Sequence, residues 1–190
     1  MKKFLSILGL TAIATVTQAQ TVNYKIEPTH TFVTFEISHF GTSTNRGRWD
    51  KKEGMVQFDR VAKTGKVDLT IDMDSINTGT AGFDKHLKGD DFFVVSKYPT
   101  AKFVGDKFAF NGDKVTEVQG QLTIRDKTNP VTLKASNFNC YMSPMIKREV
   151  CGGDFTATIA RSQWGIDFGA KFGVPDAVHL VIQVEAIKQE

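Results

Sequence analysis

Strict alternation of apolar and polar side chains is the feature that most constrains how this chain can fold. Four stretches show it clearly, namely residues 31–40, 66–76, 115–125 and 178–184. In the second stretch, for example, Val67, Leu69 and Ile71 are separated by single polar residues. A period of two places every apolar side chain on one face of a β-strand. The pattern therefore predicts antiparallel strands that cover a core on one side only.

Less regular stretches complete the set of predicted strands. They are residues 46–58, 101–110, 130–140 and 152–161, and turn signals such as Asn111-Gly112-Asp113 separate them. About eight strands result, without the alternation of strands and helices that a parallel sheet requires. Eight antiparallel strands can close into a barrel, which removes exposed edges and can enclose one ligand. We therefore predict an all-β, eight-stranded, lipocalin-like barrel, with an open β-sandwich as the alternative.

One short segment, residues 80–88, reads as a helix instead. Phe83 and Leu87 are four residues apart and share a helix face, and the opposite charges of Asp84 and Lys88 have the same spacing. Two helical turns do not persist alone in water. We therefore expect this helix to dock as a plug across one end of the barrel.

The first residues have the pattern of a signal peptide. Met1-Lys2-Lys3 is basic, Phe4–Val16 is apolar, and Thr17-Gln18-Ala19 places small residues before a cleavage site. The apolar stretch is too short for a stable membrane span. We predict a signal peptide over residues 1–19, one β-barrel domain over residues 20–190, a periplasmic or secreted location, and no stable membrane insertion.

The composition of the remaining chain indicates a single domain and argues against a nucleic-acid partner. About 170 residues suffice for one domain with a sizeable core. Removal of Lys2 and Lys3 changes the formal charge from +3 to +1, and no basic stripe suggests a nucleic-acid partner. The fifteen phenylalanines suit strands around an aromatic-lined interior.

Two cysteines, Cys140 and Cys151, bracket a ten-residue segment. In an exported protein we expect them to form a disulfide. Closing so short a loop would stabilise the fold by about 2–3 kcal/mol. A redox-active pair is disfavoured because the Cys-x-x-Cys spacing is absent.

From Tyr24 to its end, the chain resembles the YceI-like family of exported, lipocalin-like, polyisoprenoid-binding proteins. Four blocks in the family order carry the resemblance: Ile26-Glu27-Pro28-Thr29-His30-Thr31, Asp91-Phe92-Phe93 after His86-Leu87, Gly120-x-Leu122-Thr123-Ile124, and Arg161-Ser162-x-Trp164-Gly165. Gly89, Val94 and Asp126 depart from the residues usual in the family. The resemblance implies a barrel that holds a long isoprenoid lipid of the quinone or polyprenyl phosphate type.

Such a lipid needs a long dry cavity, because its chain offers only carbon and hydrogen. We expect the inward faces of the strands and the plug to line that cavity. The predicted lining residues are Val33, Phe35, Ile37, His39, Trp49, Leu69, Ile71, Met73, Leu87, Phe92, Phe103, Phe108, Leu122, Ile124, Phe155, Ile159, Leu180 and Ile182. Arg46, Arg125 and Arg161 are candidates to pair with a polar head group. No cofactor besides the lipid is expected, and transient contact with a membrane or a membrane redox protein fits this role.

The sequence gives little support for a metal site, a hydrolytic active site or a nucleotide site. The histidines His30, His39, His86 and His179 show no metal-binding spacing, and Gly-x-Ser-x-Gly and phosphate-binding glycine motifs are absent. We therefore predict a non-catalytic lipid binder without a metal site. Two alternatives stay open: an interaction domain with a filled core that supports a membrane redox system or stress response, and an enzyme that uses His39 on a lipid head group.

Overall fold

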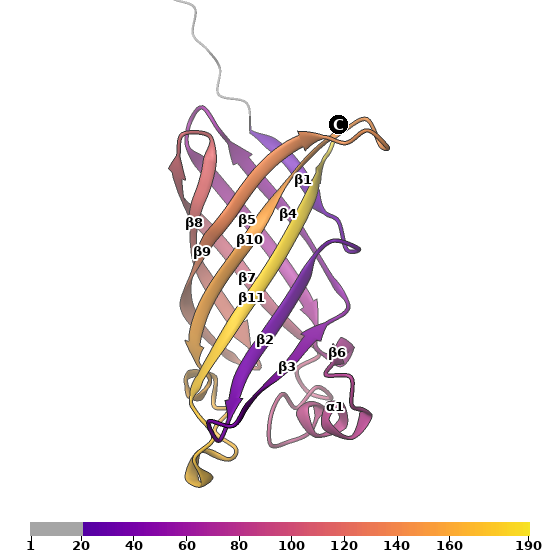
Figure 1. The fold of residues 1–190 in the computed structure, drawn as a ribbon. Helices are drawn as coiled ribbons and strands as arrows, with labels where there is room; N and C mark the ends of the chain where they lie inside the picture. The colour runs from indigo at the N-terminus through magenta and orange to yellow at the C-terminus, as the bar shows by residue number, and fades with distance from the viewer. Residues whose placement is uncertain (1–20) are drawn as a thin grey trace, which may run out of the picture.

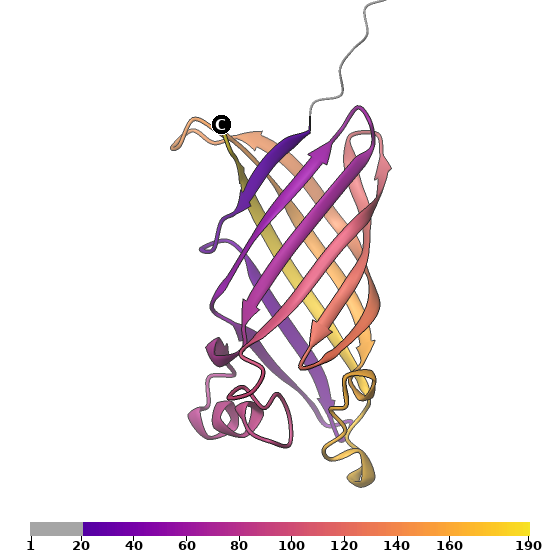
Figure 2. The same ribbon diagram turned by 180° about the vertical axis from the view of Figure 1, so that it is seen from behind.

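Eleven strand segments wind into a closed barrel in the computed structural model, which describes residues 21–190 (Figures 1 and 2). The strands are β1 (Val22–Ile26), β2 (Phe32–His39), β3 (Ser43–Trp49), β4 (Lys52–Asp59), β5 (Thr64–Asp72), β6 (Ile76–Asn77), β7 (Thr100–Asn111), β8 (Lys114–Ile124), β9 (Lys127–Met142), β10 (Glu149–Ala160) and β11 (Ala177–Lys188). The signal peptide predicted for residues 1–19 lies outside the described residues.

Eight strands complete the circle of the barrel. The hydrogen-bonded order is β1-β4-β5-β7-β8-β9-β10-β11, and β11 pairs with β1 again through contacts such as Ile26 with Ala186. All of these pairings are antiparallel. The predicted antiparallel barrel is therefore confirmed, and the β-sandwich alternative is wrong because the sheet closes on itself.

Three positions in the wall are occupied by two strand segments placed end to end. β11 pairs with β1 near its C-terminus and with β2 along residues 179–183, so β1 and β2 follow one another beside it. The second position holds β4, which pairs with β1, and β3, which pairs with β2. The next position holds β5 and then β6, which pairs with β3 only at Arg48 and Trp49. The β3 residues 43–47 therefore have one strand neighbour among the described residues instead of two.

The predicted strand over residues 66–76 is wrong at its end. β5 stops at Asp72, and Met73–Ser75 form the 3-10 helix η1. The Asp72 side chain accepts a hydrogen bond from the backbone N–H of Asp74 at 2.9 Å, which caps this turn. Met73 nevertheless remains buried, so its predicted inward position holds.

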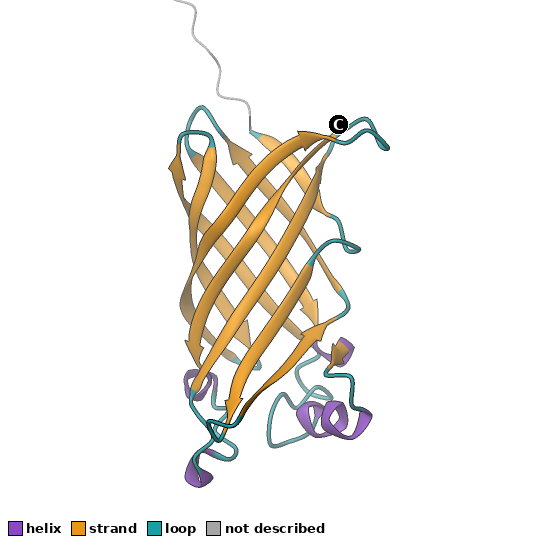
Figure 3. Cartoon of the chain, in the orientation of Figure 1, coloured by secondary structure: helices purple, strands orange, loops and turns teal. Residues whose placement is uncertain are grey.

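The helical segment is α1 (Ala81–Lys88), and it lies at one end of the barrel with η1 and two further 3-10 helices, η2 (Arg161–Trp164) and η3 (Ala170–Phe172) (Figure 3). We call this the helical end. Leu87 is buried against the barrel, as the predicted plug requires. The predicted pairing of Asp84 with Lys88 is wrong. Asp84 instead accepts hydrogen bonds from the N–H and hydroxyl of Thr78, both at 2.7 Å, and Lys88 pairs with Asp74 at 3.0 Å.

The opposite end carries the connection between β9 and β10 and the C-terminus (Figure 1). We call this the hairpin end. Cys140 and Cys151 lie directly opposite one another on β9 and β10 and form a disulfide with an S–S distance of 2.06 Å. The predicted disulfide is therefore confirmed, and it staples the base of this connection.

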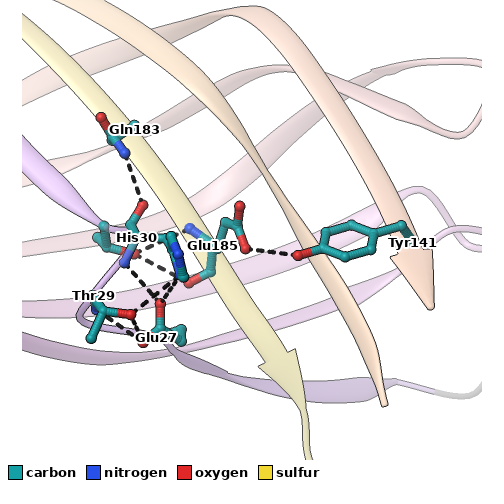
Figure 4. A network of polar contacts seen from close by, with 7 residues as sticks. Glu27, Thr29, His30, Tyr141, Gln183 and Glu185 are labelled. Atoms are coloured by element: carbon teal, nitrogen blue, oxygen red, sulfur yellow. Dashed lines mark hydrogen bonds and ion pairs between the residues drawn. The ribbon is translucent and has the colours of Figure 1, made fainter. Parts of the chain in front are cut away.

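A polar network occupies the point where the wall changes from β1 to β2 (Figure 4). The carboxylate of Glu27 accepts hydrogen bonds from the backbone N–H groups of Thr29 and His30 at 2.9 and 2.8 Å. The buried Thr31 hydroxyl bonds the backbone of Glu185 at both its N–H and its carbonyl, at 3.1 and 3.2 Å. The two Thr31 contacts satisfy the backbone N–H and carbonyl of Glu185, which lies between the residues of β11 that pair with β1 and those that pair with β2. The first block of the family resemblance thus has a structural role in this chain.

Replacing Glu27 with Gln is expected to lower the free energy of unfolding by about 1 kcal/mol at pH 7. Partial burial alone would raise the pKa of the Glu27 carboxyl, but hydrogen bonds from Thr29 and His30 outweigh it and lower this pKa to about 2. Because the folded-state pKa lies below the ordinary value of 4.5, the stabilisation is complete above that pH. It is lost as the pH falls toward 2.

Urea unfolding at several pH values measures this effect. The difference in stability between wild type and Glu27→Gln should shrink between about pH 4.5 and pH 2. Glu53→Gln is a matched control, since Glu53 is an exposed carboxylate without an ion pair among residues 21–190. A difference that does not depend on pH would contradict the assignment.

Candidate functional site

Two adjoining cavities occupy the interior of the barrel. The first has a volume of about 120 Å³ and lies toward the hairpin end, and the second has a volume of about 280 Å³ and lies beneath α1. We call them the hairpin-end cavity and the helical-end cavity. Val33, Ile71, Leu122 and Leu180 line both of them. These four side chains lie at the boundary between the two cavities, and we call them the waist.

The structure places every predicted lining residue on a cavity wall. Leu69, Phe103, Phe108, Phe155 and Ile182 face the hairpin-end cavity, and Phe35, Ile37, His39, Trp49, Met73, Leu87, Phe92, Ile124 and Ile159 face the helical-end cavity. The period-two alternation explains this outcome for the strand residues, since one face of each strand must point inward, whereas Met73, Leu87 and Phe92 belong to the segments at the helical end. The two cavities leave free space in the interior, which favours lipid binding over the filled-core alternative.

Aromatic rings form part of the wall of the hairpin-end cavity. Tyr24 is 1% exposed and stacks on Phe58 with ring centroids 4.8 Å apart, and Phe58 in turn meets the ring of Phe138 at 6.1 Å. The Tyr24 hydroxyl donates a hydrogen bond to Glu149 at 2.5 Å. Burial, together with this contact, raises the pKa of Tyr24 to about 12, so the phenol stays uncharged. No polar atom is exposed on the wall of this cavity, which suits it to hydrocarbon alone.

The hairpin-end cavity has only the hydroxyl-bearing side chains of Tyr24 and Thr31 in its wall, whereas four other polar side chains line the helical-end cavity. They are His39, Asn45, His86 and Arg161. His39 and His86 are exposed and therefore stand at the rim, whereas Arg161 is 5% exposed. The interior thus has an apolar hairpin-end cavity and a helical-end cavity with hydrogen-bonding groups near solvent.

Arg161 brings a positive charge into the wall of this half. Its Nε donates to the carbonyl of Pro175 at 2.9 Å, and Nη1 donates to the carbonyls of Ile166 and Phe168 at 3.1 and 2.8 Å. Nη2 donates to the carbonyl of Val174 at 3.2 Å. Four of the five guanidinium hydrogens are used in this way, and no carboxylate of residues 21–190 forms an ion pair with Arg161. The buried cation therefore lacks a counter-charge in direct contact.

The other two candidate arginines lie outside the cavities. Arg46 points outward from β3 and its Nε pairs with Glu36 at 2.7 Å, because even-numbered residues of this strand face solvent. Arg125 lies in the turn between β8 and β9, and its Nη1 donates to the carbonyl of Gly165 at 2.9 Å. Of the three arginines, only Arg161 lies where the predicted head-group contact requires it.

Several lining residues come from segments without strand periodicity, so the alternation could not reveal them. They are Phe83, His86 and Phe93 around α1, and Trp164, Ile166, Phe168 and Val174 in the connection between β10 and β11. Trp164 is 1% exposed, and its indole N–H donates to the carbonyl of Leu122 at 3.0 Å. The block Arg161-Ser162-x-Trp164-Gly165 was the only sequence signal that pointed to this connection.

No three His, Cys, Asp or Glu side chains of residues 21–190 come together as a ligand set for a metal. His30 contacts Glu27, His86 contacts Asp91 at 3.0 Å, and His179 lies near Thr158. Within the same residues, no helix has the length and apolar character needed to cross a membrane.

Comparison with known proteins identifies the family of this barrel. The sequence pattern of the YceI-like domain matches residues 24–186. The chain belongs to the YceI-like family. The YceI-like chain is 37% identical over 196 residues to a UPF0312 protein of Pseudomonas aeruginosa and 33% identical over 198 residues to one of Shewanella denitrificans. Both alignments cover all of each chain, so the family resemblance found in the sequence is confirmed.

Solved structures share the fold of this YceI-like barrel. Burkholderia cenocepacia BcnA matches with a TM-score of 0.71 and 24% identity, covering 84% of this chain and 98% of BcnA. The Campylobacter jejuni YCEI protein matches with a TM-score of 0.70 and 24% identity, covering 98% and 100%. A polyisoprenoid binding domain from Saccharophagus degradans matches with a TM-score of 0.62 and 16% identity, covering 87% and 98%.

Proposed function

We propose that this YceI-like protein is an exported, non-catalytic carrier of a long isoprenoid lipid. The observation that carries the proposal is the pair of adjoining interior cavities, of which the hairpin-end cavity exposes no polar atom and the helical-end cavity carries polar side chains. Its fold is shared with a domain described as polyisoprenoid-binding. Each buried CH₂ contributes about 0.8 kcal/mol, so a few isoprene units supply ample driving force against the entropy of ordering the chain.

The difference in polarity between the two cavities favours one orientation of the bound lipid. The prenyl tail passes the waist into the hairpin-end cavity, where it meets only apolar atoms. The head group stays in the helical-end cavity near Arg161, Asn45 and His39. The remaining Nη2 hydrogen of Arg161 suits a phosphate or quinone oxygen as acceptor. A phosphate would also supply a counter-charge in direct contact with Arg161.

The cavity walls support binding in preference to catalysis. Among the described residues, no carboxylate, lysine, serine or free thiol lines either cavity. His39 therefore has no carboxylate on the cavity wall to orient it as a general base, and no nucleophile stands beside it. The other histidine of this wall, His86, contacts Asp91 at 3.0 Å, but no serine, lysine or free thiol lines the cavity with it.

Export is part of the same proposal. The basic and apolar pattern of residues 1–19 and the disulfide between Cys140 and Cys151 both suit an oxidising compartment outside the cytoplasm.

Mass spectrometry of purified protein tests the proposed function. The full chain is expressed with its own leader in a bacterial host, purified without detergent and extracted with organic solvent. We expect close to one prenyl lipid per protein, and native mass spectra of the intact complex should show the same mass. Repeated lipid-free preparations that also fail to take up added prenyl lipids would refute the carrier function.

A further inference from the structure

Three phenylalanines stand exposed at the helical end. Phe40, Phe168 and Phe172 have exposed fractions of 54%, 41% and 77%, and no other phenylalanine of residues 21–190 is exposed. Phe40 lies in the turn between β2 and β3, and the other two lie in the connection between β10 and β11. Phe168 also lines the helical-end cavity. The exposed rings therefore gather around the half of the cavity that holds the polar groups.

Phe40 occupies a backbone conformation that does not favour its side chain. Its φ is +53° and that of Gly41 is +71°, and the N–H of Thr42 bonds the carbonyl of His39 at 3.0 Å. Turns with two consecutive positive φ angles normally take Asn, Asp or Gly at the first position. A bulky residue there is an outlier. Because the ring is half exposed, core packing does not account for its presence.

The exposed rings belong to one continuous rim. A Cβ atom on Gly173 would lie 3.9 Å from the Phe40 ring, so the β2–β3 turn touches the segment that carries Phe172. On the other side, the Phe168 ring lies 5.1 Å from His86 and 5.3 Å from Phe92. The rim thus runs from the β2–β3 turn across the β10–β11 connection to α1.

We propose that this aromatic rim docks on the surface of a lipid bilayer. The inference rests on the proposed function, because an isoprenoid guest must leave or enter a membrane. A prenyl tail that crossed open water would expose its CH₂ groups and lose the hydrophobic stabilisation of their burial. Docking places the mouth of the helical-end cavity against lipid and shortens that path. Phenylalanine rings lie favourably within a membrane surface, and exposed apolar clusters of this kind mark interaction sites.

Charge on the rim favours no particular lipid head group. The β2–β3 turn, residues 40–42, carries no charge, and the other rim segments, residues 80–92 and 165–173, carry three lysines and four aspartates, namely Lys85, Lys88, Lys171, Asp84, Asp90, Asp91 and Asp167. This near-neutral set would neither gather anionic lipid strongly nor repel it. The docking should therefore depend on the aromatic rings and proceed on zwitterionic membranes.

Vesicle flotation with phosphatidylcholine vesicles tests the docking. The double variant Phe40→Asp/Phe172→Asp should bind vesicles at least tenfold more weakly than wild type. Asp tolerates positive φ and Phe172 is exposed, so this variant should fold normally. Met145→Asp is the matched control, since Met145 is 89% exposed at the hairpin end. Unchanged binding by the double variant, or lost binding by Met145→Asp, would overturn the proposal. So would binding that requires anionic lipid and survives the substitutions at Phe40 and Phe172.

A second measurement separates this proposal from the carrier function. Uptake of a detergent-solubilised prenyl lipid should be the same for wild type and for Phe40→Asp/Phe172→Asp. Uptake from vesicles should be at least fivefold slower for the variant. If neither protein binds a prenyl lipid in detergent, the carrier function fails, and the flotation result still decides whether the rim binds membranes. Equal uptake from vesicles by both proteins would contradict the docking.

Discussion

Substitution of Leu87 by Asp is expected to speed the release of bound lipid at least tenfold while the barrel stays folded. Leu87 is 4% exposed and is the most buried residue of α1. Its side chain lines the helical-end cavity. Burying a carboxylate there costs several kcal/mol. Eight residues of helix cannot persist without docking. The helix should therefore leave the barrel, which exposes the head-group half of the cavity.

The barrel should survive this change because α1 contributes nothing to its strand ladder. The eight strands close by pairing β1 with β11, on hydrogen bonds that do not involve residues 81–88. Ala81→Asp is the matched control, since it places the same carboxylate at an exposed position in the first turn of α1. Release of a fluorescent prenyl lipid to acceptor vesicles gives the rate, and thermal unfolding by circular dichroism reports the fold. Collapse of the barrel in Leu87→Asp, or release at the wild-type rate, would show that α1 is not a lid.

The alternation of side chains predicted the barrel because it depends on local backbone geometry alone. Each strand needs only a period of two to fix its inner face, and Leu69, Leu122 and Leu180 lie inside for that reason. The breaks in the wall could not be predicted this way. The strand ending at Asp72 depends on a side-chain cap, and the step from β1 to β2 depends on Thr31 meeting Glu185 from a distant part of the chain.

The polar part of the site was less accessible to sequence reasoning. Arg46, Arg125 and Arg161 all appeared at strand ends or turns, and nothing in the pattern separated them. Arg161 is distinguished by the connection between β10 and β11, which folds back so that its carbonyls surround the guanidinium. A wrapped loop of this kind has no periodicity, so its lining residues Ile166 and Val174 escaped prediction as well.

Enlarging Leu180 to Trp is expected to make the protein discriminate between lipids by tail length. Leu180 lies at the waist, where it lines both cavities, and it pairs with Ala157 on β10 and Phe35 on β2. An indole at this point should close the passage into the hairpin-end cavity. Affinity for a long prenyl lipid should fall at least tenfold, whereas a head group that carries a single isoprene unit should bind within twofold of wild type.

The size of this effect follows from the burial that the indole prevents. A tenfold loss corresponds to about 1.4 kcal/mol, which is less than the contribution of two buried CH₂ groups. Any tail that extends past the waist would lose more than this. Overpacking costs about 1–3 kcal/mol of stability in a filled core, and the free space beside Leu180 should reduce that cost.

Titration of both lipids into wild type, Leu180→Trp and Val181→Trp measures this selectivity. Val181 is the outward-facing neighbour on β11 and is 37% exposed, so its replacement adds the same ring outside the barrel. Equal losses for long and short lipids would place the head group at the waist and reverse the proposed orientation. No loss for either lipid would mean that the tail does not pass Leu180. A loss confined to the long lipid, absent in Val181→Trp, requires that the hairpin-end cavity receives the tail, because only that half of the space lies beyond the substituted side chain.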